Sequence, residues 1–388
     1  MTNFSLSSAL KASALATLAV FAGCGPNDGA KEYDGGVAAY EVRDLKRAEK
    51  LFAECLGRNP GRTDALVMMA RVRKDLGELA LAKEAADKAA ALSAGDPDVI
   101  ALDAEIAYHA KDYARATRQF GEIAENAALS ASDRSLGWTG IGIVHQTCIA
   151  DSVNDGTRDL ARVAFLRAIR LDRTNAAARY HLGLLYRDAY GYPAAALEQF
   201  ELFVRLGDVA DARVQKTQRT LIPAVKEDIA RRASSLPGAS KRDAGASVTA
   251  LQKADAAWKK GQYKTARLEY DRAYKADVLS YPAALGLAKA WEKSDATDFG
   301  RRQALESYRE ACNLKPGSSA TALAAADLAM RAGRTATAAE FYSRAVAANP
   351  GDITAIDGLI RALRKVGGQS KAAAAYQQLR DTIPVRRR

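Results

Sequence analysis

The chain has 388 residues, a formal net charge of +11 and many alanines, with only 10 prolines. No stretch alternates apolar and polar residues with β-branched enrichment, which excludes a β-sheet architecture and favours helix throughout. Three histidines and four cysteines are too few and too scattered for a metal or disulfide framework, so we expect no cofactor and no metal. The positive charge favours anionic partners or surfaces but does not bear on the fold.

Residues 1–23 predict a signal peptide. Lys11 is the only charge before an apolar run of about 11 residues, which is too short for a membrane-spanning helix of roughly 20. The run ends in small residues directly before Cys24, and this stretch resembles a bacterial lipobox with Phe21 in place of the usual Leu. The resemblance implies cleavage before Cys24 and lipid on that residue, so that acyl chains anchor the protein in a membrane.

The residue after the cysteine is Gly25, which by the same resemblance implies sorting to the periplasmic face of the outer membrane. Residues 24–36 are rich in Gly and Asp and predict a flexible tether. Two alternatives stay open at this point. One is an ordinary cleaved signal, and the other is a cytosolic protein whose N-terminus is never processed.

A pair of helices then recurs along the chain, and residues 319–352 show it most clearly. An apolar first helix ends at Gly333, a second helix carries Ala338 and Tyr342 on one face, and Pro350 closes the unit. A small residue lets the two helices approach closely, an aromatic fills the remaining space, and proline ends the second helix.

The same register occurs nine times. The small residues are Ala48, Ala82, Ala116, Ala161, Ala196, Ala266, Ala304, Ala338 and Ala372, at separations of 34, 34, 45, 35, 70, 38, 34 and 34. Four residues after each of them, except where Ala86 stands, comes an aromatic: Phe52, Phe120, Phe165, Phe200, Tyr270, Tyr308, Tyr342 and Tyr376. This pattern resembles the tetratricopeptide repeat family over about residues 38–384. The resemblance implies an all-α fold, a right-handed α-solenoid of helix-turn-helix repeats.

The separation of 70 leaves room for one degenerate helical pair at Val209–Ala233, which lacks the aromatic and contains Pro223. Residues 234–247 are rich in Ser and Gly and predict a linker. We therefore expect an N-terminal array at 37–233 and a C-terminal array at 248–385. Whether the two arrays stack continuously stays open.

Histidines and glycines give no sign of catalytic chemistry. The three histidines are evenly spaced but fall at different positions of the repeat, which argues against a shared metal: His109, His145 and His181. A cluster of glycines lies inside a predicted helix with no strand before it, unlike a phosphate-binding loop: Gly137, Gly140 and Gly142.

The remaining cysteines, Cys55, Cys148 and Cys312, fall in the first, fourth and seventh clear repeats. Each repeat of a solenoid contacts only its neighbours, and a disulfide needs Cα atoms within about 7 Å. The sequence therefore predicts unpaired and mostly buried thiols.

Family resemblance implies that the first helices line a concave groove that binds an extended or helical peptide. The candidate groove residues are Arg71, Lys74, Glu105, Tyr108, Asp255, Trp258, Lys289, Arg361 and Arg364. Each of them is also compatible with an ordinary solvated or half-buried helix residue. The carboxylate clamp that some members use for chaperone tails is not matched, because Val67, Arg71, Ala101 and Glu105 occupy its positions.

The sequence thus predicts a non-catalytic, lipid-anchored scaffold that binds other proteins in a bacterial cell envelope and does not bind nucleic acid. The basic residues 386–388 are consistent with a frayed tail or with contact to anionic lipid or cell-wall polymer. Three rivals stay open: a binding protein for an anionic cell-wall polymer, an enzyme or enzyme subunit, and a soluble cytosolic adaptor.

Overall fold

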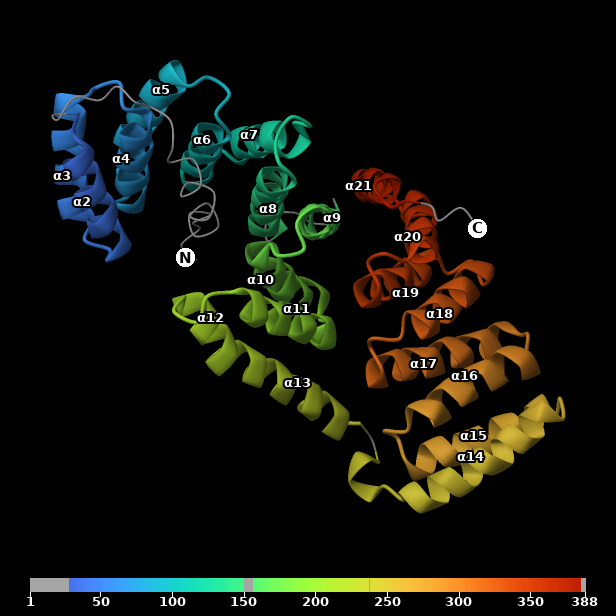
Figure 1. Ribbon diagram of the computed structural model, residues 1–388. Coiled ribbons are helices and arrows are strands. Elements are labelled where there is room, and N and C mark those ends of the chain that lie inside the picture. Colours follow the sequence, from blue (N-terminus) through green and yellow to red (C-terminus); the bar gives the residue numbers. More distant parts are fainter. Residues whose placement is uncertain (1–27, 150–155, 237, 385–388) are drawn as a thin grey trace. The chain divides into compact units, whose positions relative to one another are not determined.

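The computed structural model describes residues 28–149, 156–236 and 238–384, and every regular element within these ranges is a helix (Figure 1). The predicted all-α class is confirmed. Cys24 and the basic residues 386–388 lie outside the described residues. Among the described helices, none combines the length and the apolar character that crossing a bilayer would require.

The N-terminal half of the chain begins with helices that form consecutive hairpins. Their bounds are α2 Ala30–Glu41, α3 Leu45–Arg58, α4 Thr63–Asp75, α5 Leu79–Leu92, α6 Pro97–His109, α7 Tyr113–Glu125, α8 Ala131–Cys148 and α9 Thr157–Leu171. The middle of the chain holds α10 Ala176–Leu185, the π-helix η2 Tyr186–Tyr190, α11 Pro193–Leu206, α12 Ala212–Lys216, the π-helix η3 Thr217–Leu221, α13 Ile222–Ser234 and the short 3₁₀ turn η4 Ala239–Lys241.

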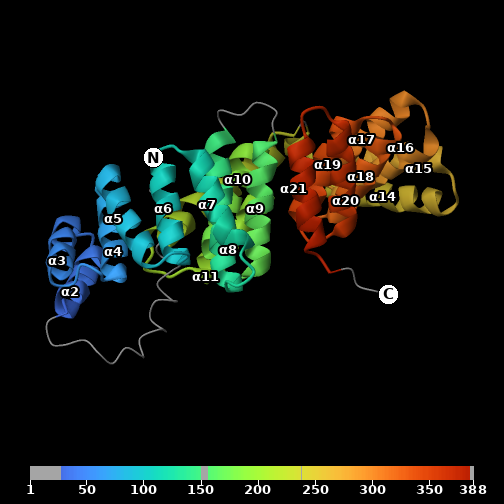
Figure 2. The same cartoon turned by 90° about the horizontal axis from the view of Figure 1, so that it is seen from above.

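Four further hairpins complete the chain: α14 Ala244–Lys259 with α15 Tyr263–Ala276, α16 Tyr281–Ser294 with α17 Asp298–Leu314, α18 Ser319–Arg331 with α19 Thr335–Ala348, and α20 Ile353–Lys365 with α21 Ser370–Asp381. They follow one another in chain order in two perpendicular views (Figures 1 and 2). Each second helix also packs on the first helix of the next hairpin. This nearest-neighbour packing is typical of repeat proteins.

The chain divides into two compact units. The first comprises Met1–Thr147 with Arg167–Ala178, and the second comprises Cys148–Leu166 with Arg179–Arg388. The division runs through α9 and α10 and does not fall at the predicted linker, because most of α10 and all of α11 to α13 belong to the same unit as the last four hairpins. The two arrays that we expected as separate domains stay a prediction.

The predicted repeat register is visible in the burial of its residues. We call the nine small residues of the register, from Ala48 to Ala372, the crossing alanines. All nine are fully buried, and so are most of the aromatics four residues later. A methyl group lets the two helix backbones come close, and the ring next to it fills the remaining space. These two positions therefore explain why each hairpin packs in the same way.

Several hairpins use a left-handed backbone in the turn between their two helices. Gly77, Gly261 and Gly333 have φ values of 83°, 70° and 70° at this turn. Arg43 and Lys111 adopt the same conformation, with φ values of 64° and 63°. Gly333 thus ends the first helix as predicted, because glycine adopts this conformation without the steric penalty that a Cβ brings.

The predicted tether of residues 24–36 is wrong in its second half, because α2 begins at Ala30. Gly36 lies inside this helix, and a Cβ at that position would meet the ring of Phe52 at 2.7 Å. The glycine therefore serves a close helix contact and not chain flexibility. Glycine content alone does not distinguish these two roles.

The degenerate helical pair predicted at Val209–Ala233 is also wrong. Elements α12, η3 and α13 follow one another without a break and form one helical run from Ala212 to Ser234. Pro223 lies in the first turn of α13, directly after the π-helix η3. Proline lacks the N–H that an uninterrupted α-helix would use, and local widening to a π-helix lets the run continue past it.

Two glycines, Gly140 on α8 and Gly121 on α7, allow a test of the close packing between these helices. A Cβ at Gly140 would lie 2.5 Å from the Phe120 ring, whereas a Cβ at Gly121 would meet nothing within 4 Å. We expect Gly140→Ala to lower the free energy of unfolding by about 1–3 kcal/mol, because the ring must move. Gly121→Ala, inside α7, should raise it by up to about 1 kcal/mol through helix propensity. Urea unfolding followed by circular dichroism measures both, and equal stability of the two variants would contradict this packing.

Candidate functional site

Tyrosine hydroxyls in the second unit donate hydrogen bonds to carboxylates on the first helix of the same hairpin. The pairs are Tyr270 with Asp255 at 2.5 Å, Tyr308 with Glu292 at 3.0 Å, and Tyr342 with Asp327 at 2.5 Å. Burial, followed by the nearby Asp327, raises the pKa of Tyr342 to about 12, so this hydroxyl keeps its proton and donates. Each of the three carboxylates thus has a neutral hydroxyl partner, and Glu292 also accepts from Arg331 at 2.5 Å.

The first helices α14, α16, α18 and α20 together carry eight lysines and arginines against four carboxylates. The fourth carboxylate, Asp357, accepts from Arg380 at 3.3 Å. Within the described residues, Lys289, Arg361 and Arg364 are exposed and form no salt bridge with a carboxylate. With eight cationic side chains against four carboxylates, this face of the second unit has an excess of positive charge, and the hydroxyls occupy acceptor sites on three of those carboxylates. We call these four helices the basic first-helix face.

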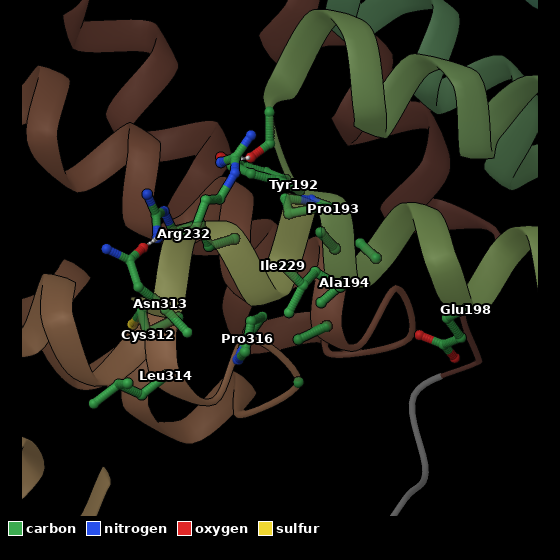
Figure 3. A pocket seen from close by; sticks show the side chains of 18 of the residues that line it. Tyr192, Pro193, Ala194, Glu198, Ile229, Arg232, Cys312, Asn313, Leu314 and Pro316 are labelled. Atoms are coloured by element: carbon green, nitrogen blue, oxygen red, sulfur yellow. Dashed lines mark hydrogen bonds between the residues drawn. The ribbon is translucent and has the colours of Figure 1, made fainter. Parts of the chain in front are cut away.

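A pocket of about 490 Å³ lies in the same unit, between the start of α11, the end of α13 and the helix ends of α17 to α19 (Figure 3). Its walls are mostly apolar, from Ile229 and Leu236 on one side and Leu314, Pro316 and Ala347 on the other. Its volume falls within the range of about 300–1,000 Å³ that is usual for ligand sites.

Two arginines from different helices reach this pocket. Arg344 donates to the Oδ1 of Asn313 at 2.8 Å, and Arg232 donates to the carbonyl oxygen of Gly191 at 3.3 Å (Figure 3). The Arg344 guanidinium also lies 5.5 Å from the ring centroid of Tyr192, which lines the pocket at the start of α11. Its Nε is buried without a hydrogen-bond partner. The pocket thus combines apolar walls with a few polar groups.

Beside the pocket, a buried charge joins residues far apart in the sequence. Arg162 on α9 is fully buried and donates to Asp159 at 2.9 Å and to the Ser343 hydroxyl at 2.9 Å. Its Nε donates to the hydroxyl of Tyr376, and its guanidinium lies 4.4 Å from the ring centroid of Tyr190. We call these five residues the Arg162 network.

Asp159 is the acceptor at the centre of this network. The hydroxyls of Tyr190 and Tyr376 donate to its Oδ1 at 2.7 and 2.8 Å. Burial raises the pKa of both tyrosines well above the usual value, so both hydroxyls remain protonated donors. A buried ion pair is tolerated only when its remaining hydrogen-bonding capacity is also satisfied, and here three hydroxyls contribute to that.

A tetratricopeptide repeat model matches residues 251–298 and 300–353. These segments match the tetratricopeptide repeat family. The match covers the hairpins from α14 to α19, whose register the sequence had placed in the same family. Tetratricopeptide repeat proteins generally mediate interactions between proteins. No curated protein matches the chain by sequence.

Several solved structures are similar in fold. A tetratricopeptide repeat protein of Thermus thermophilus is 19% identical, with a TM-score of 0.43 over 51% of this chain and 99% of that one. The pilF protein of Pseudomonas aeruginosa is 18% identical, with a TM-score of 0.40 over 54% and 93%. A chain of the APC/C hetero-tetramer Cut9-Hcn1 is 15% identical, with a TM-score of 0.35 over 98% and 82%. These scores lie below 0.5 and carry no argument about function.

The repeats of the first unit place the predicted groove residues in unequal environments. Lys74 and Glu105 are each only 4% exposed and form a salt bridge with each other. Arg71 is half-buried, and the half-buried Tyr108 shares a hydrogen bond of 2.9 Å with Thr147. Lys74 and Glu105 are thus part of the packing between α4 and α6, and their burial makes them unsuited to contact a ligand.

The repeats of the second unit place their predicted residues closer to solvent. Asp255 is exposed but accepts from Tyr270, and Trp258 is half-buried with its ring 5.0 Å from that of Tyr263. Lys289 and Arg361 are exposed at the same position of their repeats as Asp255. Arg364 is exposed and donates to Gln377 at 3.3 Å. A ligand role for these residues stays a prediction.

The sequence analysis missed the Arg162 network and the pocket. Both depend on contacts between residues separated by more than 100 positions, for which a repeat register gives no signal. One local signal was present. Tyr376 is the tyrosine of the last hairpin, yet Arg361 and Arg364 stand where the other hairpins carry their acids. The last hairpin thus has no acid at the position from which the other tyrosines take theirs, which indicated that the partner of Tyr376 must come from elsewhere.

The pair of Lys74 and Glu105 gives a sharp stability test. Lys74→Met leaves a buried carboxylate without its cation and should lower the free energy of unfolding by about 3–5 kcal/mol. The double variant Lys74→Met, Glu105→Leu should return to within about 1 kcal/mol of the wild type, because both charges are then absent. Urea unfolding measures these values. Lys88→Met, which breaks an exposed pair with Glu84, is the matched control and should cost less than about 1 kcal/mol.

Proposed function

We propose that this chain is a non-catalytic scaffold that binds other proteins through the basic first-helix face and is anchored by lipid on Cys24 in a bacterial cell envelope. The family match to tetratricopeptide repeats supports the protein-binding part of this proposal. The sequence before and at Cys24 supports the anchor.

The observation that carries the binding proposal is the engagement of carboxylates by tyrosine hydroxyls. In three consecutive hairpins a carboxylate takes its hydrogen bond from a neutral tyrosine and not from a lysine or arginine. Glu292 is the one of the three that also accepts from a cation, Arg331. The exposed Lys289, Arg361 and Arg364 therefore keep their charge available for an acidic segment of a partner. Complementary charge of this kind raises the rate of association and selects partners by sign.

Anchoring would add to this binding. Acyl chains on Cys24 would hold the scaffold at one surface, so that two partners bound by one chain meet at a raised effective concentration. An envelope-assembly complex, on the periplasmic face of the outer membrane, is the context in which such an anchored scaffold would act.

Charge reversal tests the binding surface. The variant Lys289→Glu, Arg361→Glu, Arg364→Glu should weaken recovery of crosslinked partners from the native cell by about tenfold or more, since each exposed pair contributes up to about 1 kcal/mol. Circular dichroism should be unchanged, because all three side chains are exposed. Mass spectrometry of crosslinked products identifies and quantifies the partners.

The matched control reverses Lys264, Arg302 and Lys371, which are exposed on second helices and change the net charge equally. Equal partner recovery by both variants would contradict the proposed surface. Salt-sensitive binding to purified cell-wall fractions, with no protein partner recovered, would favour the rival anionic-polymer function suggested by the net charge of +11.

The anchor has its own test. Intact-mass measurement on protein from the native membrane should show a chain that begins at Cys24 and carries acyl groups. Cys24→Ser should abolish that mass and release the protein from the membrane, whereas Cys148→Ser should keep both the lipid and the location. A wild-type chain that retains Met1 and stays in the soluble fraction would instead favour the cytosolic adaptor.

A further inference from the structure

The pocket and the Arg162 network of the second unit share residues. Ser343 accepts from Arg162, and the next residue, Arg344, lines the pocket. Tyr192 also lines the pocket, and its hydroxyl reaches the Ser343 hydroxyl at 3.4 Å. Ser343 therefore joins the network to two residues of the pocket wall, Arg344 along the chain and Tyr192 through its hydroxyl.

The network differs in kind from the contacts inside the hairpins. Crossing alanines and aromatic rings hold each hairpin together by apolar burial. By contrast, Arg162 and Asp159, which form an ion pair within α9, contact the Ser343 hydroxyl on α19 and the Tyr376 hydroxyl on α21 through hydrogen bonds. Separating apolar surfaces exposes them to water, and no new interaction offsets the unfavourable free energy of that exposure. Opening this contact leaves the ion pair within α9 intact and exposes it to water, and hydration of the two charges offsets part of the lost hydrogen bonding. Of the two contact types, the polar one is better suited to open and close.

The hairpins themselves do not depend on the network. Tyr270, Tyr308 and Tyr342 find their carboxylates within their own hairpins, and only Tyr376 takes its carboxylate from α9. If α9 moves away, one hydroxyl loses its acceptor and the apolar packing of α20 on α21 remains.

The π-helix η2 adds a local reason for mobility. It holds Tyr190, which donates to Asp159, but it also buries the Tyr186 hydroxyl without a hydrogen-bond partner. A buried unsatisfied hydroxyl costs free energy, and π-helical turns are frequent at functional sites. Releasing η2 from the network would let this hydroxyl meet water.

We propose that the Arg162 network is a latch. When closed, it holds α9 and η2 against α19 and α21 and keeps the adjoining pocket shut at Tyr192 and Arg344. When released, the start of α11 separates from α19 and the pocket opens to larger ligands, while the hairpins α14 to α21 stay folded. This inference goes beyond the proposed scaffold function and does not rest on it, because the latch is tested without any partner.

Cys312 is a native reporter of this opening. Its thiol lines the pocket, is free and is only 4% exposed, and burial raises its pKa to about 11. In the closed state it should react slowly with N-ethylmaleimide, because the thiolate is the reactive form and is scarce. Cys55 in the first unit is also a buried free thiol and serves as an internal control.

We expect Arg162→Met and Asp159→Asn to speed modification of Cys312 by at least about tenfold in mildly alkaline buffer, with Cys55 unchanged, as quantified by peptide mass spectrometry. Arg272→Met, which breaks an exposed pair with Glu269 on α15, is the matched control and should leave Cys312 unchanged. Unaltered Cys312 reactivity in both network variants would overturn the latch.

Hydrogen exchange separates opening from unfolding. In the variants, amides of α15, α16 and α21 should remain protected, because these helices stay folded, while those of η2 and the start of α9 lose protection. Loss of protection throughout the second unit would overturn the proposal, since no distinct open state would then exist. The wild type gives a further test without any substitution. Amides of η2 and the start of α9 should exchange together and faster than those of α15 and α16, and a single common rate would contradict the latch.

Discussion

The closest approach of two paired helices is the constraint on which the hairpins depend. At that point there is room for a methyl group, and the nine crossing alanines from Ala48 to Ala372 are fully buried there. Where an aromatic ring lies flat on a neighbouring helix, glycine is required: a Cβ at Gly358 would fall 2.2 Å from the ring of Tyr342. Each hairpin thus satisfies its own packing and needs only its neighbours, which makes a chain of similar units stable.

The earlier and later repeats differ in the aromatic residue that follows the crossing alanine. The aromatic after the crossing alanine is phenylalanine up to Phe200 and tyrosine from Tyr270 onwards. Phenylalanine needs no polar partner, whereas a buried tyrosine hydroxyl does. Carboxylates on the first helices meet that need, and the lysines and arginines beside them are left exposed. Packing inside the hairpin and charge on its surface are therefore linked, and this link supports a binding role for the basic first-helix face.

The Arg162 network applies the same requirement across a long distance. Arg361 stands where the other tyrosine-bearing hairpins carry their acid, and Asp159 on α9 supplies a carboxylate for Tyr376 together with the fully buried Arg162. Buried ionic groups add little stability compared with apolar packing, but they fix which surfaces meet. The result is a specific contact between segments more than 200 residues apart, beside a pocket whose walls come from the same elements.

The sequence by itself determined the helical class, the repeat register, the crossing alanines and the glycine turn at Gly333. These features are local, since they depend on residues within about 34 positions of one another and recur often enough to be recognised. It did not determine that α2 begins at Ala30 or that one helical run replaces the pair before residue 234, because glycine and proline are compatible with more than one backbone. Only the tertiary structure decided that Lys74 and Glu105 are buried together and that Arg162 meets Tyr376. The chemistry of such contacts depends on which surfaces meet, and a repeating pattern of neighbours carries no information about distant ones.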